Sequence, residues 1–307
     1  MATGYITHAD CELHEMETGH PESPKRLAAI AEYLKQREVY DKLVHLEAPL
    51  AEKNQLYRVH RRDYVDNIFE ACPTQGAEVL GPDVLANQHT LAAALRAAGA
   101  GVLAVDQIMA NKIRSAFCAI RPPGHHAERS KAMGFCVFNN VAVAAAHALA
   151  VHGLKRVAIV DFDVHHGNGT EDTLQGDSRI LFCSSYQHPF YPFSVPESSH
   201  SNIMHTPMHA GTGSDEFRDW VREHWIPKLD HFQPELLFIS AGFDAHQADP
   251  MADVHLDERD YKWVTRELRL IADKYCGGSI VSCLEGGYDL TALSRSAYQH
   301  ILALMEP

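Results

Sequence analysis

The chain has no long apolar run, no leader typical of export and no paired-cysteine motif. None of its apolar stretches reaches the roughly 18 consecutive residues that a membrane-spanning helix needs. Its first residues, Met1–His8, lack the basic-then-apolar order of a secretory signal. The 7 cysteines are scattered and never spaced C-x-x-C, which favours reduced thiols over disulfides. We therefore expect a cytoplasmic protein that does not insert into a membrane.

Basic clusters are also absent. The 307 residues include 27 Lys and Arg against 40 Asp and Glu, which gives a net charge of −13. No basic cluster is longer than the pairs Lys25-Arg26 and Arg61-Arg62. Because such a charge repels nucleic acid, we expect no nucleic-acid partner. The same charge favours cationic substrates, such as lysine-rich peptides or polyamines.

The hydrophobic pattern predicts an α/β fold in a single domain that spans residues 1–307. Short apolar runs typical of buried parallel strands alternate with helical patterns, and no linker or internal repeat interrupts them. The predicted strands are 115–120, 156–160, 180–184, 236–240 and 279–284, and the predicted helices are 25–38, 89–111, 139–151, 215–229, 260–275 and 292–305. Residues 186–213 are expected to be irregular. This order predicts a central, mostly parallel sheet with helices on both faces.

Four of the predicted strands lead to residues that can bind a metal or move a proton. In chain order these residues are His125-His126, then Asp161, Asp163 and His165, then Asp244, and finally Tyr288. In open α/β sheets, sites form just beyond the carboxyl ends of the strands. The residue types therefore predict an enzyme that uses a single metal for hydrolysis.

The predicted metal ligands are Asp163, His165 and Asp244. Side chains alternate along a strand, so Asp161, Asp163 and His165 point the same way if the extended chain continues past the strand end. Asp244 adds a second carboxylate from another strand end, and His246 is a rival ligand two residues further along. Three protein ligands with one open position are typical of a catalytic zinc site.

The tandem histidines predict general acid–base chemistry. Pro122, Pro123 and Gly124 precede them and can hold both rings rigidly, with Asp161 as a natural partner for one. Tyr288 follows two glycines at a strand end, where its phenol can donate a hydrogen bond to a developing oxyanion.

Taken together in this order, these segments resemble the histone deacetylase family in its broad sense. That family includes acetylpolyamine amidohydrolases and bacterial deacetylase-like amidohydrolases. The resemblance runs from the segment His20–Arg26 to the segment Glu285–Leu290. It implies the arginase-like fold and a zinc-dependent amidohydrolase that removes acetyl, or related short acyl groups, from acylated lysine side chains of a peptide or protein.

The resemblance also assigns roles to the residues of the predicted site. It implies that Asp163, His165 and Asp244 bind one catalytic zinc ion, that His126 is the general base and that His125 assists. Asp161 would support His125, and Tyr288 would polarise the scissile carbonyl. Asn168 stands where class I members carry an aspartate beside the second histidine, which makes this chain similar to class II and bacterial members.

One or two structural potassium ions are implied as well. The first would use Asp161, Asp163, His165, Ser184 and Ser185, partly through backbone atoms. The second would use backbone atoms around Leu174, Asp177 and Ile180.

For the substrate, the resemblance implies that Phe135, next to Gly134, and Tyr191 form the walls of an acyl-lysine tunnel. Asp83 would hold the substrate backbone at the rim, and Arg26 would lie near an internal channel for acetate. Met251 falls where a polyamine-selective member carries a glutamate.

Three other functions stay open. Acetylpolyamine deacetylation is favoured by the net charge and opposed by Met251, whose thioether cannot pair with an ammonium group. An arginase-like two-manganese hydrolase would need more carboxylates at the strand ends. A non-catalytic module that senses a ligand would have no need of the complete set of acid, base and oxyanion-stabilising groups.

Overall fold

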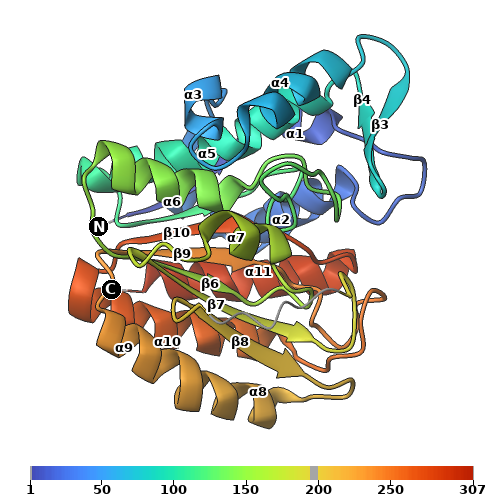
Figure 1. Cartoon of the computed structure of the whole chain (residues 1–307). Helices are drawn as coiled ribbons and strands as arrows, with labels where there is room; N and C mark the ends of the chain where they lie inside the picture. The colour runs from blue at the N-terminus through green and yellow to red at the C-terminus, as the bar shows by residue number, and fades with distance from the viewer. Residues whose placement is uncertain (1, 194–199, 307) are drawn as a thin grey trace.

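A single sheet of eight parallel strands forms the centre of the computed structural model, which describes residues 2–193 and 200–306 (Figure 1). The strand order is β2-β1-β5-β10-β9-β6-β7-β8, and every neighbouring pair is parallel. The bounds are β1 (Thr3–Thr7), β2 (Val44–Glu47), β5 (Ser115–Cys118), β6 (Val157–Asp161), β7 (Ile180–Gln187), β8 (Ile203–Met208), β9 (Leu236–Ala241) and β10 (Ile280–Leu284). Only β5 separates β1 from β10, so both ends of the chain contribute to one layer.

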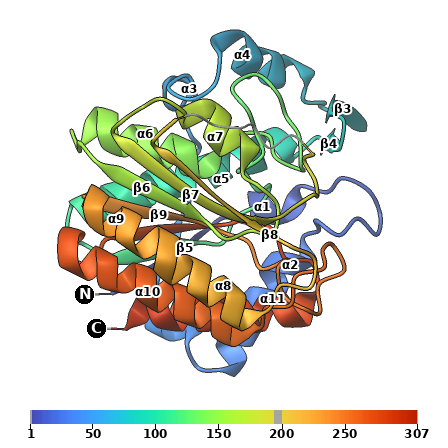
Figure 2. The ribbon, with the colours of Figure 1, turned by 60° about the horizontal axis from the view of Figure 1, so that its bottom comes forward.

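Helices cover both faces of this sheet (Figures 1 and 2). One face carries α5 (Thr90–Met109) and α6 (Asn140–Val151), with α1 (Asp10–Leu13), α3 (Lys53–Leu56), α4 (Arg62–Ala71) and α7 (Asn168–Leu174) on the same side. The other face carries α2 (Lys25–Gln36), α10 (Glu258–Cys276) and α11 (Leu290–Met305), with α8 (Ser214–Trp220) and α9 (Ile226–Phe232) packed along α10. The predicted α/β fold, a mostly parallel sheet between two helical layers, is confirmed.

Helix α5 packs closely because its residues are small. A Cβ on Gly99 would lie 2.0 Å from the carbonyl oxygen of Pro49, and one on Gly101 would lie 2.9 Å from the Cβ of Ala144 on α6. In the described part of the chain, α5 is also the one helix long and apolar enough to cross a membrane by length and composition. Since 67% of that apolar window is buried inside the structure, α5 has the character of a core helix.

Every predicted strand and helix is present, with bounds shifted by a few residues, except that the one helix predicted over 215–229 is divided into α8 and α9 by a π-helical segment, Val221–Trp225. Several elements were not predicted. These are β1, β2, β8, α1, α3, α4, α7 and a separate antiparallel hairpin of β3 (Ala77–Gly81) and β4 (Val84–Asn87). The segment expected to be irregular, 186–213, contains the end of β7 and all of β8, while its residues 194–199 lie outside the described residues. Strand β8 escapes the apolar pattern because it includes His205, Thr206 and Pro207, and a proline is tolerated there because β8 is an edge strand.

The ends of the described chain meet at the amino-terminal edge of the sheet (Figure 1). The hydroxyl of Thr3, in β1, donates to the carbonyl oxygen of Leu304, in α11, at 3.3 Å. The backbone N–H of Arg114 donates to the carbonyl oxygen of Ala2 at 2.9 Å. The loops that follow the strands lie at the opposite, carboxyl-terminal edge.

Candidate active site and metal centre

The loops after five neighbouring strands meet at the carboxyl-terminal edge of the sheet. These strands are β5, β10, β9, β6 and β7, in their order across the sheet. Their loops carry, in the same order, His125 and His126, Tyr288, Asp244, Asp163 with His165, and Tyr191. Because parallel strands all end at one edge, side chains that are distant in the sequence converge here.

Asp163, His165 and Asp244 form a buried cluster whose ligand atoms all lie within 4.8 Å of one another. His165 Nδ1 lies 3.1 Å from Asp163 Oδ1 and 3.2 Å from Asp244 Oδ2. Backbone N–H groups hold the other two carboxylate oxygens: Val164 donates to Asp244 Oδ1 at 2.9 Å, and Gly286 donates to Asp163 Oδ2 at 2.8 Å. The carboxylates are therefore fixed in place by the chain itself.

This cluster fits one divalent cation. Asp244 Oδ2 is buried and has no hydrogen-bond partner among the described residues, which is rare unless an ion completes the site. In a tetrahedral zinc site with bonds of about 2.0–2.2 Å, ligand atoms lie roughly 3.3–3.6 Å apart. The separations of 3.1 and 3.2 Å around His165 Nδ1 are close to that range. The rival ligand His246 faces Glu258 instead, at 3.4 Å.

Two glycines, Gly286 and Gly242, leave the space that the carboxylates of Asp163 and Asp244 occupy. A Cβ on Gly286 would lie 2.0 Å from Asp244 Oδ2 and 2.7 Å from Asp163 Oδ2. A Cβ on Gly242 would lie 2.0 Å from Asp163 Oδ2. Contacts this short do not occur in proteins, so any other residue at either position would displace the cluster.

The tandem histidines lie beside the cluster, each with its own partner. Their rings are 4.0 Å apart between centroids. His125 Nδ1 is 2.9 Å from Asp161 Oδ2, and His126 Nδ1 is 2.7 Å from Asn168 Oδ1. The Asn168 amide nitrogen donates to Glu128 Oε1 at 2.7 Å, so Asn168 Oδ1 is an acceptor and His126 Nδ1 carries the proton. The lone pair of His126 is therefore on Nε2.

The pKa values of the two histidines shift in opposite directions because their surroundings differ. Burial opposes the charged form of His125, but the nearby carboxylates of Asp163 and Asp161 raise the pKa of His125 well above its usual value. Burial, together with His125 and His165 nearby, lowers the pKa of His126 well below its usual value. A lowered pKa favours the neutral form of His126, which is suited to the role of proton acceptor.

Tyr288 is positioned by a buried charge network. Arg26 is fully buried; its Nε donates to the carbonyl oxygen of Gly287 at 2.7 Å, and its Nη2 donates to that of Glu285. The Arg26 guanidinium also lies 5.0 Å from the centre of the Tyr288 ring. Glu22 holds Arg26 Nη1 at 3.1 Å. Arg26 therefore fixes the turn that carries Tyr288.

A cavity of about 260 Å³ leads to these groups. It is lined by His126, His165, Tyr288, Gly134, Phe135, Phe190, Tyr191, Met251 and Asp83. The predicted tunnel walls Phe135 and Tyr191 both face it, as do Met251 and Asp83. Phe135 adopts a φ of +65°, a strained backbone conformation that places its ring 6.2 Å from that of Tyr288.

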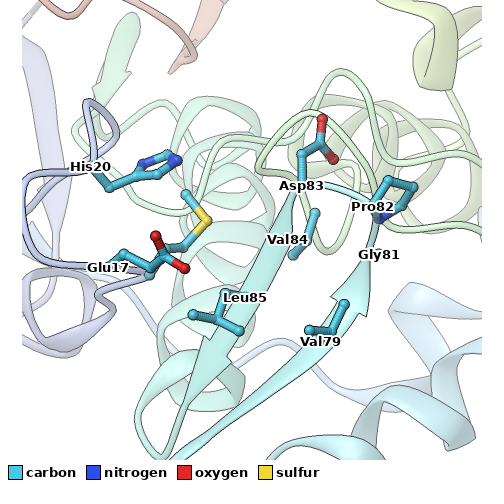
Figure 3. A pocket seen from close by; sticks show the side chains of 9 residues that line it. Glu17, His20, Val79, Gly81, Pro82, Asp83, Val84 and Leu85 are labelled. Atoms are coloured by element: carbon cyan, nitrogen blue, oxygen red, sulfur yellow. The ribbon is translucent and has the colours of Figure 1, made fainter.

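Asp83 ties the two sides of the cavity together. Its Oδ1 accepts from the backbone N–H of Gly134 at 2.8 Å, and its Oδ2 accepts from the Tyr191 hydroxyl at 2.9 Å. A second cavity of about 230 Å³ lies between the segment that includes Glu17 and His20 and the β3–β4 hairpin, and Asp83 borders it too (Figure 3). Asp83 therefore lines both cavities.

Comparisons with known proteins agree with this geometry. The histone deacetylase domain family matches residues 20–304. The chain belongs to the histone deacetylase family. It is 36% identical to histone deacetylase 14, chloroplastic, of Arabidopsis thaliana, over 98% of this chain and 76% of that one. It is 32% identical to the polyamine deacetylase HDAC10 of Homo sapiens, over 99% of this chain and 48% of that one.

The solved structure of the HDA15 HD domain has the same fold. Its TM-score is 0.92 at 33% identity, covering 99% of this chain and 89% of that one. Coverage of the relatives' own length varies widely, since the chain spans only 20% of another curated relative, the type-2 histone deacetylase 2 of Dictyostelium discoideum. Membership of this family makes the chain a hydrolytic deacetylase, and the family implies a metal-dependent reaction.

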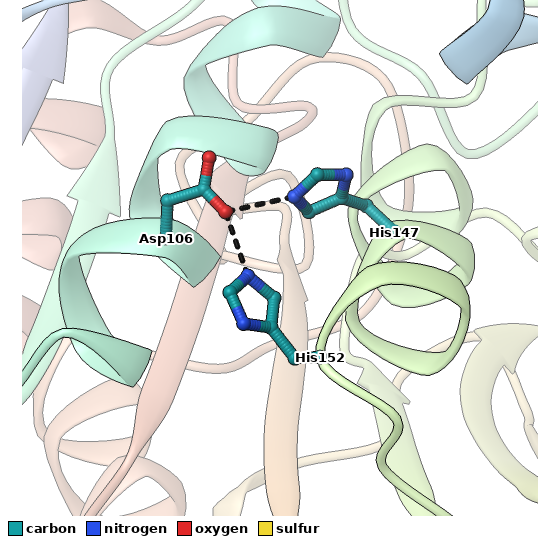
Figure 4. Close-up of side chains that lie close together, drawn as sticks. All are labelled: Asp106, His147 and His152. Carbon is teal, nitrogen blue, oxygen red and sulfur yellow. Dashed lines mark hydrogen bonds and ion pairs between the residues drawn. The ribbon is translucent and has the colours of Figure 1, made fainter.

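Two other groups of His, Asp and Glu in the described chain could hold a metal, but neither lines the deacetylase cavity. In the first, Asp106 Oδ1 accepts from His147 Nε2 at 2.8 Å and His152 Nε2 at 2.7 Å (Figure 4). Arg58, which can only donate, lies 3.2 Å from His147 Nδ1, so the His147 proton is on Nε2. A protonated Nε2 cannot bind a metal. The second group is His166, Glu171 and His205.

The residues expected around the first potassium ion lie together in this family member. Asp161 and Ser184 are paired in register between β6 and β7. The hydroxyl of Ser185 is buried and has no hydrogen-bond partner among the described residues. The Ser184 hydroxyl lies 3.1 Å from His166 Nδ1. Potassium at this point stays a prediction.

The residues expected around the second potassium ion do not fit one. The carbonyl oxygens of Leu174, Asp177 and Ile180 do converge, but on the side-chain amide nitrogen of Asn202, at 3.2, 3.2 and 3.1 Å. The position expected for the cation is thus filled by the chain.

Two site residues of this deacetylase, Glu285 and Phe190, were not predicted. Glu285 accepts from the backbone N–H groups of Gly124 at 2.7 Å and His125 at 3.1 Å, and burial raises the pKa of Glu285 to about 7. Phe190 stacks on the metal-cluster histidine His165 at 5.5 Å. The position of Glu285 next to two glycines at a strand end was a usable signal, whereas nothing in the sequence separates Phe190 from Tyr191.

Proposed function

We propose that the chain is a zinc-dependent amidohydrolase that removes acetyl, or a related short acyl group, from acylated lysine side chains. One observation carries the proposal: the buried Asp163–His165–Asp244 cluster lies beside His126 and Tyr288 in one cavity with aromatic walls. We further propose that residues 1–307 act as one catalytic domain in the cytoplasm, with potassium bound at the first cation site by Asp161, Asp163, His165, Ser184 and Ser185.

Each group in the cavity has a defined role in the proposed reaction. Asp163, His165 and Asp244 would hold the zinc ion, which when bound polarises the acyl carbonyl and lowers the pKa of water. His126 accepts the proton of the attacking water through Nε2, because its Nδ1 is committed to Asn168. The Tyr288 hydroxyl donates to the developing oxyanion. A histidine of the pair then protonates the leaving amine.

The cavity walls suit an acylated lysine. Phe135 and Tyr191 would pack on the aliphatic stem and exclude water from the reacting amide. Asp83 would hold the substrate backbone at the rim, where it already accepts two hydrogen bonds. The adjoining cavity, with Glu17 on its lining, offers space and negative charge for basic residues that flank the lysine.

Acetylpolyamine deacetylation is the second candidate. The net charge of −13 favours a polycationic substrate, and one relative is named a polyamine deacetylase. Met251 opposes it, because this residue lines the cavity and a thioether cannot pair with a distal ammonium group.

Metal analysis combined with a substrate screen tests the proposal. We expect about one zinc per chain, loss of activity on chelation, and recovery when zinc is restored. Acetyl-, trifluoroacetyl- and longer acyl-lysine peptides would be compared with acetylspermidine and acetylputrescine. Higher kcat/KM on the acetylpolyamines would favour the second candidate. Binding of zinc with no turnover of any acylated amine would contradict both and favour a ligand-sensing role.

A further inference from the structure

Three backbone carbonyls, from the end of α7, the loop that follows it and the start of β7, point at one atom. That atom is the side-chain nitrogen of Asn202, which lies just before β8. Asn202 Nδ2 donates to the carbonyl oxygens of Leu174 at 3.2 Å, Asp177 at 3.2 Å and Ile180 at 3.1 Å. Asn202 is 9% exposed, so these contacts are shielded from water.

The orientation of the Asn202 amide is fixed by its other end. Asn202 Oδ1 accepts from the backbone N–H of Gly176 at 3.1 Å, within the same loop. A flipped amide would place Oδ1 against three carbonyl oxygens and Nδ2 against an N–H donor, which reverses four favourable contacts. The nitrogen therefore belongs at the convergence point.

Three converging carbonyls need positive charge between them. Each oxygen carries a partial negative charge, and in a buried site their mutual repulsion must be offset by a cation or by a donor. Asn202 brings two N–H groups, enough to serve all three oxygens if one hydrogen is shared. The resemblance described above implies potassium at this point, and the geometry of this chain disagrees.

We propose that the side-chain amide of Asn202 takes the place of the second monovalent cation, so that this chain braces the α7–β7 loop without potassium. The consequence reaches the active site. Leu174 is the last residue of α7, and Asn168, the partner of His126, is its first. Asn202 is thus a positioning residue that holds the far end of the helix on which Asn168 lies.

Thermal unfolding of Asn202 variants tests the proposal. The variants Asn202→Ala and Asn202→Asp are compared with wild type in potassium chloride and in choline chloride of equal ionic strength. Gln175→Ala is the matched control, since Gln175 lies exposed in the same loop. Potassium bound at the first cation site would change the Tm of wild type and of all three variants equally. The measured quantity is therefore the difference in Tm between each variant and wild type in the same salt.

In choline chloride we expect Asn202→Ala to lower Tm by about 3–8 °C, and Asn202→Asp to lower it further because a carboxylate would face three carbonyls. Potassium should restore at least half of each loss, because removing the amide vacates a carbonyl site. Gln175→Ala should match wild type in both salts. An Asn202→Ala protein with unchanged Tm would overturn the proposal.

Anomalous diffraction from wild-type crystals soaked in thallium(I), a potassium mimic, gives a readout that does not depend on folding of the variants. We expect no anomalous peak among the carbonyl oxygens of Leu174, Asp177 and Ile180. A peak there, with Asn202 turned away, would overturn the proposal. This experiment does not involve catalysis, so its failure would be distinct from failure of the proposed deacetylase function.

Discussion

At the scale of single residues, the site depends on atoms held at contact distance by the chain. Asp163, His165 and Asp244 are brought together by backbone donors, and Gly286 and Gly242 leave them just enough room. Substitutions that remove or add a single chemical group can therefore show which residues are needed for metal binding and which are needed only for turnover.

Tyr288→Phe removes only the hydroxyl proposed to stabilise the oxyanion. We expect zinc content to stay at wild-type level while kcat falls about 100- to 1,000-fold, the usual cost of losing one oxyanion donor. Steady-state kinetics and metal analysis on the same preparation check this. Tyr298→Phe is the control, since Tyr298 contacts Tyr33 on the outer helices. A kcat within threefold of wild type would remove Tyr288 from the mechanism.

Gly286→Ala places a methyl group only 2.0 Å from Asp244 Oδ2. Because the cluster must move, we expect zinc affinity to fall at least 10-fold, with activity recovered only at high zinc. Competition with a fluorescent chelator measures the affinity. Gly213→Ala serves as the control, because an added Cβ there would meet no atom within 4 Å. Equal zinc affinities in the two variants would contradict the prediction, because they would mean that the turn at Gly286 adjusts to the added methyl group without disturbing the ligands.

The sequence is a good guide to some of these residues and a poor one to others. Asp163 and His165 could be predicted because side chains alternate along a strand, so these two point to the same side. Asp244 could be predicted because it follows a buried strand. Glu22 and Arg26 could be matched to a family segment, but no local pattern shows that Arg26 holds the Tyr288 turn, since that contact joins residues 261 positions apart. The amide of Asn202 is also hidden from the sequence, because its contacts lie 22 to 28 positions away and follow no local pattern.

At the scale of elements, the β3–β4 hairpin is the part of the site that the apolar pattern does not reveal. Its strand β3 is mostly exposed, so it lacks the buried alternation by which strands are recognised. Yet the turn between its strands carries Asp83, which fixes Gly134 on one side of the cavity and Tyr191 on the other. The predicted strands β5, β6, β7, β9 and β10 are buried along their whole length, and this exposed hairpin was missed because burial is the property that the apolar pattern reports. Strand β1 is also largely buried but was missed, because Thr3–Thr7 is not a continuous apolar run.

Asp83→Ala should loosen both cavity walls while leaving the metal cluster intact. Hydrogen bonds to a carboxylate contribute about 1.5–3 kcal/mol, so we expect KM for an acyl-lysine peptide to rise about 10-fold or more, with a smaller change in kcat. Kinetics across a range of peptide concentrations separate the two constants. Glu78→Ala, on the same hairpin and exposed, is the control. A change confined to kcat would contradict a role in substrate binding.

At the scale of the whole molecule, a buried ionic network links the amino-terminal segment to the site. Glu22 is fully buried and accepts from Arg121 Nη2 at 2.7 Å and from Arg26 Nη1 at 3.1 Å. Burial acts to raise the pKa of Glu22, but the two guanidinium groups outweigh burial and lower it to about 2. The pKa of Glu22 in the folded chain is thus below its value in the unfolded chain, near 4.5.

This difference predicts a dependence of stability on acid. Because the unfolded state binds the proton more readily, the Glu22 contribution is complete above about pH 4.5 and is lost as the pH falls toward 2. Glu22→Gln should flatten that part of the profile. It should also cost about 3–5 kcal/mol at pH 7, because it leaves buried charges without their partner.

Urea unfolding between pH 2.5 and 7 measures this effect. Asp63→Asn, which breaks an exposed pair with Arg61, should leave the profile close to that of wild type. If Glu22→Gln and wild type lose stability in parallel below pH 4.5, other groups determine the acid sensitivity.

The meeting of Ala2 and Thr3 with Arg114 and Leu304 has an engineering consequence. Both ends of the described chain, Ala2 and Glu306, lie on the side opposite the catalytic mouth, so a short peptide could join them into a closed ring without approaching the pocket. A backbone-cyclised version should therefore deacylate at the native rate while resisting digestion from its ends. A partner protein fused at either end would likewise leave the entrance open to large acylated substrates.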